Sequence, residues 1–140
     1  MLVLAGTSAR GALLNTADFT DTLYAENVSQ ITGIGWAPDG SNRLFVIRKG
    51  GQVMIIENGI VLLTPFATFS PIHTYSECGL VGFTFDPGFA SNGYSYFFVS
   101  VTTYEQRILR YTAVGNTDNS LTTIVSGLPT EGNNHDGGGI

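Results

Sequence analysis

Cysteine is almost missing from this sequence, since Cys78 is its single representative in 140 residues. A lone cysteine excludes a framework of internal disulfides, so packing and hydrogen bonds must hold the fold together. It does not decide the redox compartment. We expect Cys78 to be a small packed residue rather than a reactive thiol.

Basic residues and long apolar runs are scarce as well. Six Lys and Arg are scattered through the chain against 11 Asp and Glu, which gives a net charge of −5. Without a basic cluster to neutralise phosphates, nucleic acid is not an expected partner. No apolar run approaches the roughly 20 residues that cross a bilayer, and the longest, near Val61, is interrupted by Thr64 and Pro65. We therefore expect no membrane span.

Glycine, by contrast, is abundant, with 18 residues, and hydrophobic side chains make up 43% of the chain. This balance is typical of short strands joined by tight turns, and the length is that of one globular domain. We therefore expect an all-β domain, which we place at residues 28–140.

We expect residues 1–27 to form a separate N-terminal segment. We interpret it as a possible remnant of a secretory signal followed by a lead-in strand, because residues 1–5 are apolar and small residues follow them. A basic n-region is missing, so an ordinary strand or a cloning remnant is the alternative. The first interpretation predicts a secreted, periplasmic or extracellular protein.

A repeat is the most informative feature, because a repeated supersecondary unit decides the architecture. Residues 33–39 (GIGWAPD) and 82–88 (GFTFDPG) share the order glycine, apolar, small, aromatic, any residue, proline and turn residue. A turn and then apolar strands follow each of these two anchors. The expected second, third and fourth strands are residues 43–48, 52–57 and 60–69 in the first unit, and 94–101, 107–114 and 121–126 in the second.

Two four-stranded antiparallel units of about 40–50 residues each have the period of propeller blades. The sequence therefore predicts about two blades of an incomplete β-propeller, with Gly139 and Ile140 beginning a third. A small β-sandwich is the alternative, but it does not explain the shared anchors. Ile34, Trp36, Phe83 and Phe85 are predicted on the innermost strands. The residues expected to supply much of the buried apolar surface are Trp36, Phe45, Val46, Phe83, Phe85, Tyr96, Phe97, Ile108 and Leu109.

The loops that lead into innermost strands are the expected place for chemistry, because they reach the mouth of a propeller's channel. Glu77 precedes Gly82 and His135 precedes Gly139 by similar distances in sequence. The two side chains could therefore converge on one ligand pocket from adjacent blades. Histidine takes up a proton near neutral pH, so His135 is a candidate general base. The alternative is a solvated histidine in a glycine-rich tail.

Other polar residues are weaker candidates. Residues 39–42 and 115–120 are rich in oxygen but lack the ligand spacing of a calcium loop, so we interpret both as hairpin turns. His73 has no metal-type spacing to His135 and is expected at the surface. Arg107 and Arg110 alternate with apolar neighbours and are expected to cover the outer face of a blade.

Residues 77–98 (ECGLVGFTFDPGFASNGYSYFF) resemble the signature E/Q-x-G-L-L-G-h-A-F-H-P-x-F-x-x-N-G-Y-h-Y of the glucose/sorbosone dehydrogenase family, the soluble quinoprotein sugar dehydrogenases. Residues 32–59 resemble the first repeat of that family, and residues 134–138 (NHDGG) resemble its H-x-G-G catalytic segment. The three motifs stand in the family's order. Asp86 departs from the pattern where the family usually has His, and Val81 replaces its second Leu.

The resemblance implies a six-bladed propeller that binds pyrroloquinoline quinone (PQQ) over its channel, with calcium helping to hold and polarise the cofactor. It implies oxidation of the anomeric carbon of an aldose, with His135 taking the proton of the C1 hydroxyl while hydride passes to the quinone. Glu77 matches the Gln or Glu beside the cofactor, and Asn134 matches an orienting neighbour of the histidine. The calcium ligands and the basic residues that grip the quinone are expected outside this chain, so the 140 residues alone are expected to be inactive.

Two classes of function follow from the resemblance. The first is a PQQ-dependent sugar dehydrogenase, with a small-molecule sugar and an external electron acceptor as partners. The second is a non-catalytic extracellular recognition propeller resembling hedgehog-interacting protein. His135 and the glycine pair at 137–138 favour the enzyme. In either case the open edges and faces of isolated blades predict self-association.

Overall fold

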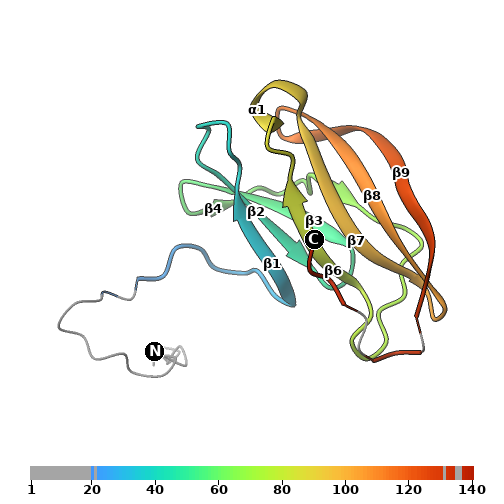
Figure 1. Cartoon of the computed structure of the whole chain (residues 1–140). Helices are drawn as coiled ribbons and strands as arrows, with labels where there is room; N and C mark the ends of the chain where they lie inside the picture. The colour runs from blue at the N-terminus through green and yellow to red at the C-terminus, as the bar shows by residue number, and fades with distance from the viewer. Residues whose placement is uncertain (1–19, 21, 131, 135–136) are drawn as a thin grey trace, which may run out of the picture.

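The computed structural model describes Thr20 and residues 22–130, 132–134 and 137–140. Within this part the chain forms two antiparallel sheets, one from each repeat (Figure 1). The strands of the first sheet are β1 (Ile31–Trp36), β2 (Arg43–Arg48), β3 (Gln52–Glu57), β4 (Ile60–Val61) and β5 (Ala67–Thr68). Those of the second are β6 (Leu80–Phe85), β7 (Tyr94–Thr102), β8 (Glu105–Val114) and β9 (Thr117–Pro129).

A one-turn helix, α1 (Phe89–Asn92), joins β6 to β7, where the sequence predicted a plain turn. Gly93 closes this helix in the left-handed conformation, with a φ of 68°, which glycine adopts at no steric cost. In the described part of the chain, no helix has the length and apolarity needed to span a membrane.

Each repeat forms its own sheet, in which neighbouring strands follow one another in sequence. The first sheet has the order β1-β2-β3-β4, with β5 also paired to β3, and the second has the order β6-β7-β8-β9. The anchor strands β1 and β6 lie at equivalent edges, and each has a register shift just before its anchor glycine, Gly33 or Gly82. The predicted pair of antiparallel blades, one from each repeat, is therefore confirmed.

The fourth strand is the least regular part of the repeat. In the first sheet the expected strand at residues 60–69 consists of two short pieces, β4 and β5, both paired with β3. Proline has no N–H to donate to a ladder, and the chain departs from β3 at Leu63, which is 99% exposed, and Pro65. The second sheet has no such interruption, so β9 is longer than predicted.

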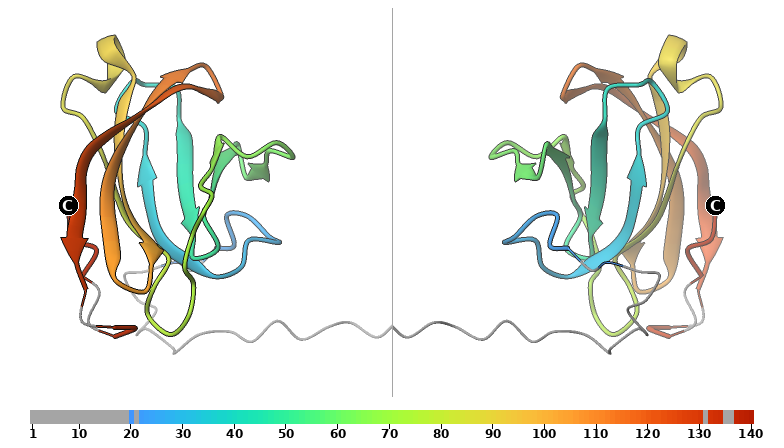
Figure 2. Two further views of the ribbon diagram at one scale, coloured as in Figure 1. Left: turned by 90° about the vertical axis from the view of Figure 1, so that its right-hand side faces the viewer. Right: turned by 90° about the vertical axis from the view of Figure 1, so that its left-hand side faces the viewer.

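The two sheets pack face to face around one aromatic core (Figure 2). Phe45 of β2 is fully buried, and its ring lies edge-on to Phe66 and Phe85 with centroids 5.0 and 5.1 Å apart. Val46, the next residue, faces the other side, where it packs under Ala25 and Val28 of the lead-in segment. Adjacent residues of β2 thus bury opposite faces, as expected for a strand between two layers.

The prediction that Trp36 is buried is wrong, because 52% of its surface is exposed. β1 lies at the edge of the first sheet, and among the described residues the lead-in segment and Val61 pack on the outer face of this sheet. The ring of Tyr24 from that segment lies edge-on to Trp36 with centroids 5.5 Å apart. Val46, Phe97 and Leu109 are buried as expected, whereas Phe83, Phe85, Tyr96 and Ile108 are half-buried.

Candidate functional site

Three segments meet at the end of the sheets where β6 begins. They are the turn between β2 and β3, the β5–β6 loop (residues 69–79) and the 132–134 segment that follows β9. Lys49 of the turn donates its ammonium hydrogen to the carbonyl oxygen of Ser76. The lysine of the first blade therefore contacts the loop that leads into the second.

Asn133 is held from two sides by the β5–β6 loop. The N–H of Glu77 donates to the Asn133 carbonyl oxygen at 3.0 Å. Nε2 of His73 donates to the Asn133 side-chain Oδ1 at 2.8 Å. Cys78 lies beneath this contact, fully buried, with Sγ 3.9 Å from the carbonyl oxygen of Gly132. Cys78 is thus a packed residue, as predicted.

The expected surface position of His73 is wrong, since the residue is half-buried and bonded to the 132–134 segment. Its own N–H also donates to the carbonyl oxygen of Ser100 in β7, at 2.8 Å. The sequence carries no signal for this contact, because His73 and Asn133 are 60 residues apart in the chain and lie on segments before and after the second sheet.

The two predicted cofactor-binding residues, Glu77 and Asn134, lie on adjoining segments of the site. Both side chains are exposed to solvent. Asn134 accepts a hydrogen bond of 2.6 Å at its Oδ1 from the hydroxyl of Ser76, the residue before Glu77. The geometry thus joins the loop of Glu77 to that of Asn134, on the side of the protein that Lys49 also reaches.

The candidate base His135 lies outside the described residues, as does Asp136. The backbone beyond them is described from Gly137 onward. A Cβ atom at Gly82 would lie only 1.8 Å from the Gly138 carbonyl oxygen, and one at Gly138 would lie 2.7 Å from the Val81 carbonyl oxygen. Glycine is therefore required at both positions, because the chain returns directly against the anchor of the second blade.

The two oxygen-rich turns converge at the opposite end of the sheets, beside α1 (Figure 1). Their oxygens surround an arginine. Arg43 donates to Asp39 Oδ2 at 2.5 Å, to Asn116 Oδ1 at 3.1 Å and to the carbonyl oxygen of Gly115. Residues 39–42 form a turn, as predicted, whereas only Gly115 and Asn116 of the second segment form a turn and residues 117–120 belong to β9. The guanidinium of Arg43 occupies the place between these oxygens where a cation would bind. Among the residues that the structure describes, no group of three or more His, Cys, Asp or Glu side chains is placed to hold a metal ion.

Asp86, the departure from the family pattern, also lies at this far end. Its carboxylate accepts hydrogen bonds from Asn92 Nδ2 at 2.9 Å, from the N–H of Gly88 at 2.8 Å and from the Tyr96 hydroxyl at 3.0 Å. These bonds, that of Asn92 first, hold the pKa of Asp86 below its ordinary value. Asp86 therefore stabilises the turn around α1 and is remote from Glu77 and Asn134.

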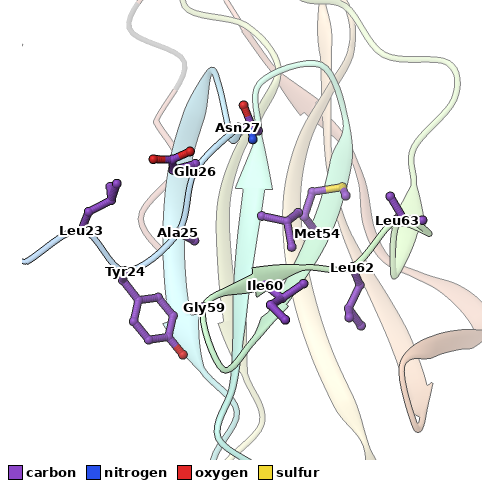
Figure 3. A pocket seen from close by; sticks show the side chains of 11 residues that line it. Leu23, Tyr24, Ala25, Glu26, Asn27, Met54, Gly59, Ile60, Leu62 and Leu63 are labelled. Carbon is purple, nitrogen blue, oxygen red and sulfur yellow. The ribbon is translucent and has the colours of Figure 1, made fainter. Parts of the chain in front are cut away.

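A groove of about 600 Å³ lies on the outer face of the first sheet (Figure 3). It is lined by residues 23–27 of the lead-in segment, by Met54 and by residues 59–63. Leu23, Ile60 and Leu63 are largely exposed along it. The groove is mainly apolar and shares no residue with the polar site at the start of β6.

The comparisons with known proteins agree with this architecture. The model of the family described as Glucose / Sorbosone dehydrogenase matches residues 28–140. No curated protein matches the chain.

Two solved structures are similar in fold. One is a putative oxidoreductase (glucose dehydrogenase) from Thermus thermophilus, with a TM-score of 0.74 at 18% identity, over 84% of this chain and 36% of that one. The other is the PQQ-bound form of an aldose sugar dehydrogenase from Streptomyces coelicolor, with a TM-score of 0.66 at 20% identity, over 77% of this chain and 33% of that one. The chain thus spans about a third of the length of these structures.

Proposed function

Because the chain belongs to the glucose/sorbosone dehydrogenase family, we propose that it supplies part of the active site of a PQQ-dependent enzyme that oxidises an aldose at its anomeric carbon. The observation that supports this most strongly is the junction of two loops. The loop of Glu77 is hydrogen-bonded to Asn133 and Asn134, and these residues directly precede His135 in sequence.

The polar groups at this junction suit an anionic, oxygen-rich cofactor. The Asn134 side chain receives the Ser76 hydroxyl at Oδ1, so its Nδ2 is the group that can donate to a cofactor oxygen. Lys49 places a positive charge on the adjacent loop. The Glu77 carboxylate can only accept hydrogen bonds when ionised, so it would hold an N–H group of the cofactor. We propose Glu77 and Asn134 as cofactor-binding residues on these grounds.

His135 is proposed as the catalytic residue. As a general base it would accept the proton of the sugar C1 hydroxyl, which makes the C1 hydrogen easier to remove. When bound, PQQ supplies the oxidising power, because it accepts the two electrons that leave the sugar as hydride. The product is then the lactone. Asn134 would orient the neighbouring imidazole and so limit the positions that the base can take.

Calcium, an external electron acceptor and export are further parts of the proposal. The ligands of a calcium ion would come from outside the described residues. An electron acceptor is needed because a reduced quinone must be reoxidised before the next turnover. We also propose a secreted, periplasmic or extracellular location, and self-association of the 140-residue chain through its open sheet faces.

The decisive experiment is a dye-linked assay of aldose oxidation with added PQQ and calcium, on a form of the protein in which this chain is part of a complete ring of blades. His135→Ala should lower turnover by at least about 10²-fold and leave quinone binding intact, since it removes only the base. Glu77→Ala, as the companion variant, should weaken quinone binding first, because it removes the oxygen that would accept the N–H group of the cofactor. The 140 residues alone should show no turnover, because a base without the rest of its cofactor site cannot hold sugar and quinone in contact.

A complete form that binds no quinone would contradict the proposal and favour a recognition propeller. Unchanged turnover in His135→Ala would show that another group takes the proton.

A further inference from the structure

We propose that His73 is a positioning residue, which fixes the 132–134 segment through Asn133 and thereby the peptide that leads to His135. The inference rests on the proposed function only where it assigns the base to His135. The contacts that carry it lie entirely within described residues.

His73 is itself anchored before it reaches Asn133. Its N–H donates to the carbonyl oxygen of Ser100 in β7, at 2.8 Å, so its backbone is tied to a central strand of the second blade. Its side chain is half-buried. An anchored and partly buried side chain loses little further freedom when it bonds to a partner, which makes the contact effective.

Asn133 is bonded at two atoms to the same loop. Its carbonyl oxygen accepts from the N–H of Glu77 at 3.0 Å, and its Oδ1 accepts from Nε2 of His73 at 2.8 Å. One bond alone would leave the residue free to rotate about it, whereas two bonds fix its orientation. Without the His73 bond, the Asn133 side chain would lose this anchor, and the 132–134 segment would keep the bonds from the N–H of Glu77 and from the Ser76 hydroxyl.

The chemistry of the contact assigns the protons. An amide Oδ1 only accepts, so Nε2 of His73 must carry a hydrogen, and in the neutral ring Nδ1 carries none. Sγ of Cys78 lies 4.0 Å from the same Oδ1. The thiol is a second, weak donor near this atom, which agrees with its assignment as the amide oxygen. With Nε2 engaged as a donor, His73 orients its neighbour rather than serving as a second base at this nitrogen.

A base must lie within hydrogen-bond reach of the proton it removes, and a displacement of about 1 Å can cost roughly 10²-fold in rate. Asn133 precedes His135 by two residues. Loosening Asn133 should therefore lower turnover without removing any group that contacts the sugar.

Two matched amide variants test the proposal in the full chain. His73→Gln places an N–H donor near the position of Nε2, whereas His73→Asn has the same amide on a shorter side chain that does not reach Asn133. His73→Leu removes the donor altogether. Amide hydrogen exchange at Glu77, whose N–H bonds to Asn133, should be at least about fivefold faster in the Asn and Leu variants and close to wild type in the Gln variant. The exchange of Phe97 in the core should not change in any of them.

Equal exchange at Glu77 in all four proteins would overturn the inference, as would equal acceleration in the Gln and Asn variants. In a form that oxidises sugar, His73→Leu should lower kcat about tenfold with KM for the sugar unchanged, and His73→Gln should restore it. Faster exchange at Glu77 with an unchanged kcat would refute the link to catalysis. If the wild-type protein oxidises no sugar, the proposed function fails, and the exchange measurement still decides whether His73 positions Asn133.

Discussion

Nη1 of Arg43 in the first blade donates a hydrogen bond of 3.1 Å to Oδ1 of Asn116 in the second. A second hydrogen bond joins the same two blades, in which Nδ2 of Asn116 donates to Oε1 of Glu57 in the first blade at 2.9 Å. Arg43 also pairs with Asp39 on its own blade and is 8% exposed. The two blades are therefore joined at this end by a partly buried network of charged and amide groups.

Arg43→Ala should destabilise the chain by about 2 kcal/mol, because Oδ2 of Asp39 and the Gly115 carbonyl oxygen lose the donors that Arg43 supplies. Arg43→Lys should recover only part of the lost stability, since an ammonium lacks the planar fork that reaches several oxygens at once. Denaturant unfolding measures the free energy of unfolding of both variants. Arg107→Ala is the matched control, because the Arg107–Glu105 pair is at the surface and its loss should leave the midpoint almost unchanged.

Acid should destabilise the far end of the sheets. The pKa of Asp86 is held below its ordinary value near 3.8 by the bonds from Asn92, Gly88 and Tyr96. For Asp39, burial alone would raise the pKa, but the bonds from Ser41 and Arg43 outweigh it and lower the value. A carboxyl with a lowered folded-state pKa stabilises the fold above about pH 4, and this contribution is lost as the pH falls through the ordinary and then the folded-state value.

Asp86→Asn tests this pH dependence, because the amide keeps an oxygen for the N–H of Gly88 and has no charge to lose. The variant should be less stable than wild type at pH 7, and its melting temperature should fall less steeply between about pH 5 and pH 2, a window set by the ordinary pKa of aspartate. Parallel curves for the two proteins would contradict the role given to Asp86.

Phe45→Ala should destabilise the chain by about 3–5 kcal/mol, since it leaves a cavity between the two sheets. Trp36→Ala, which removes a larger but half-exposed ring, should cost no more than about 1 kcal/mol. Thermal melts compare the two. Should Phe45→Ala fail to fold, Phe45→Leu keeps most of the volume and should still be less stable than Trp36→Ala. The reverse order would show that the outer face, and not the space between the sheets, is the main core.

Self-association of the 140-residue chain should depend on the outer face of the first sheet. The double variant Ile60→Asp with Leu63→Asp places charges in the apolar groove and should shift the sedimentation boundary toward monomer. Leu121→Asp on β9 is the control, because Leu121 is also exposed but lies on the other sheet. A monomeric wild type at high concentration would contradict the prediction, and a larger effect of Leu121→Asp would place the contact on β9.

The repeat made most of the fold predictable. Gly33 and Gly82 fix where each first strand begins, and β2 and β3 have the bounds that the turns around them indicate. The division of the fourth strand near Pro65 and the exposure of Trp36 could not be read in the same way. The division of the strand and the exposure of Trp36 both depend on which segments pack beside a strand. The local sequence pattern shows only which residues are apolar.

The site was predictable in part. Glu77 and His135 were expected on adjacent loops, because each precedes an anchor glycine by a similar distance, and the resemblance added Asn134 to the second loop. His73 could not be found, since its partner Asn133 belongs to a different repeat and no spacing rule links the two. Arg43 was missed for a related reason. The oxygens around it come from two turns that each resemble an ordinary hairpin.

The ring of Phe45 has consequences for how the chain is made. Its neighbours Phe85 on β6 and Phe89 on α1 belong to the second repeat, so the apolar face of the first sheet stays open until they leave the ribosome. At a synthesis rate of about 5–20 residues per second, that interval is roughly 2–8 s. A nascent chain that carries only the first blade is therefore a natural client for a chaperone, and slow translation through the second repeat would lengthen its exposure.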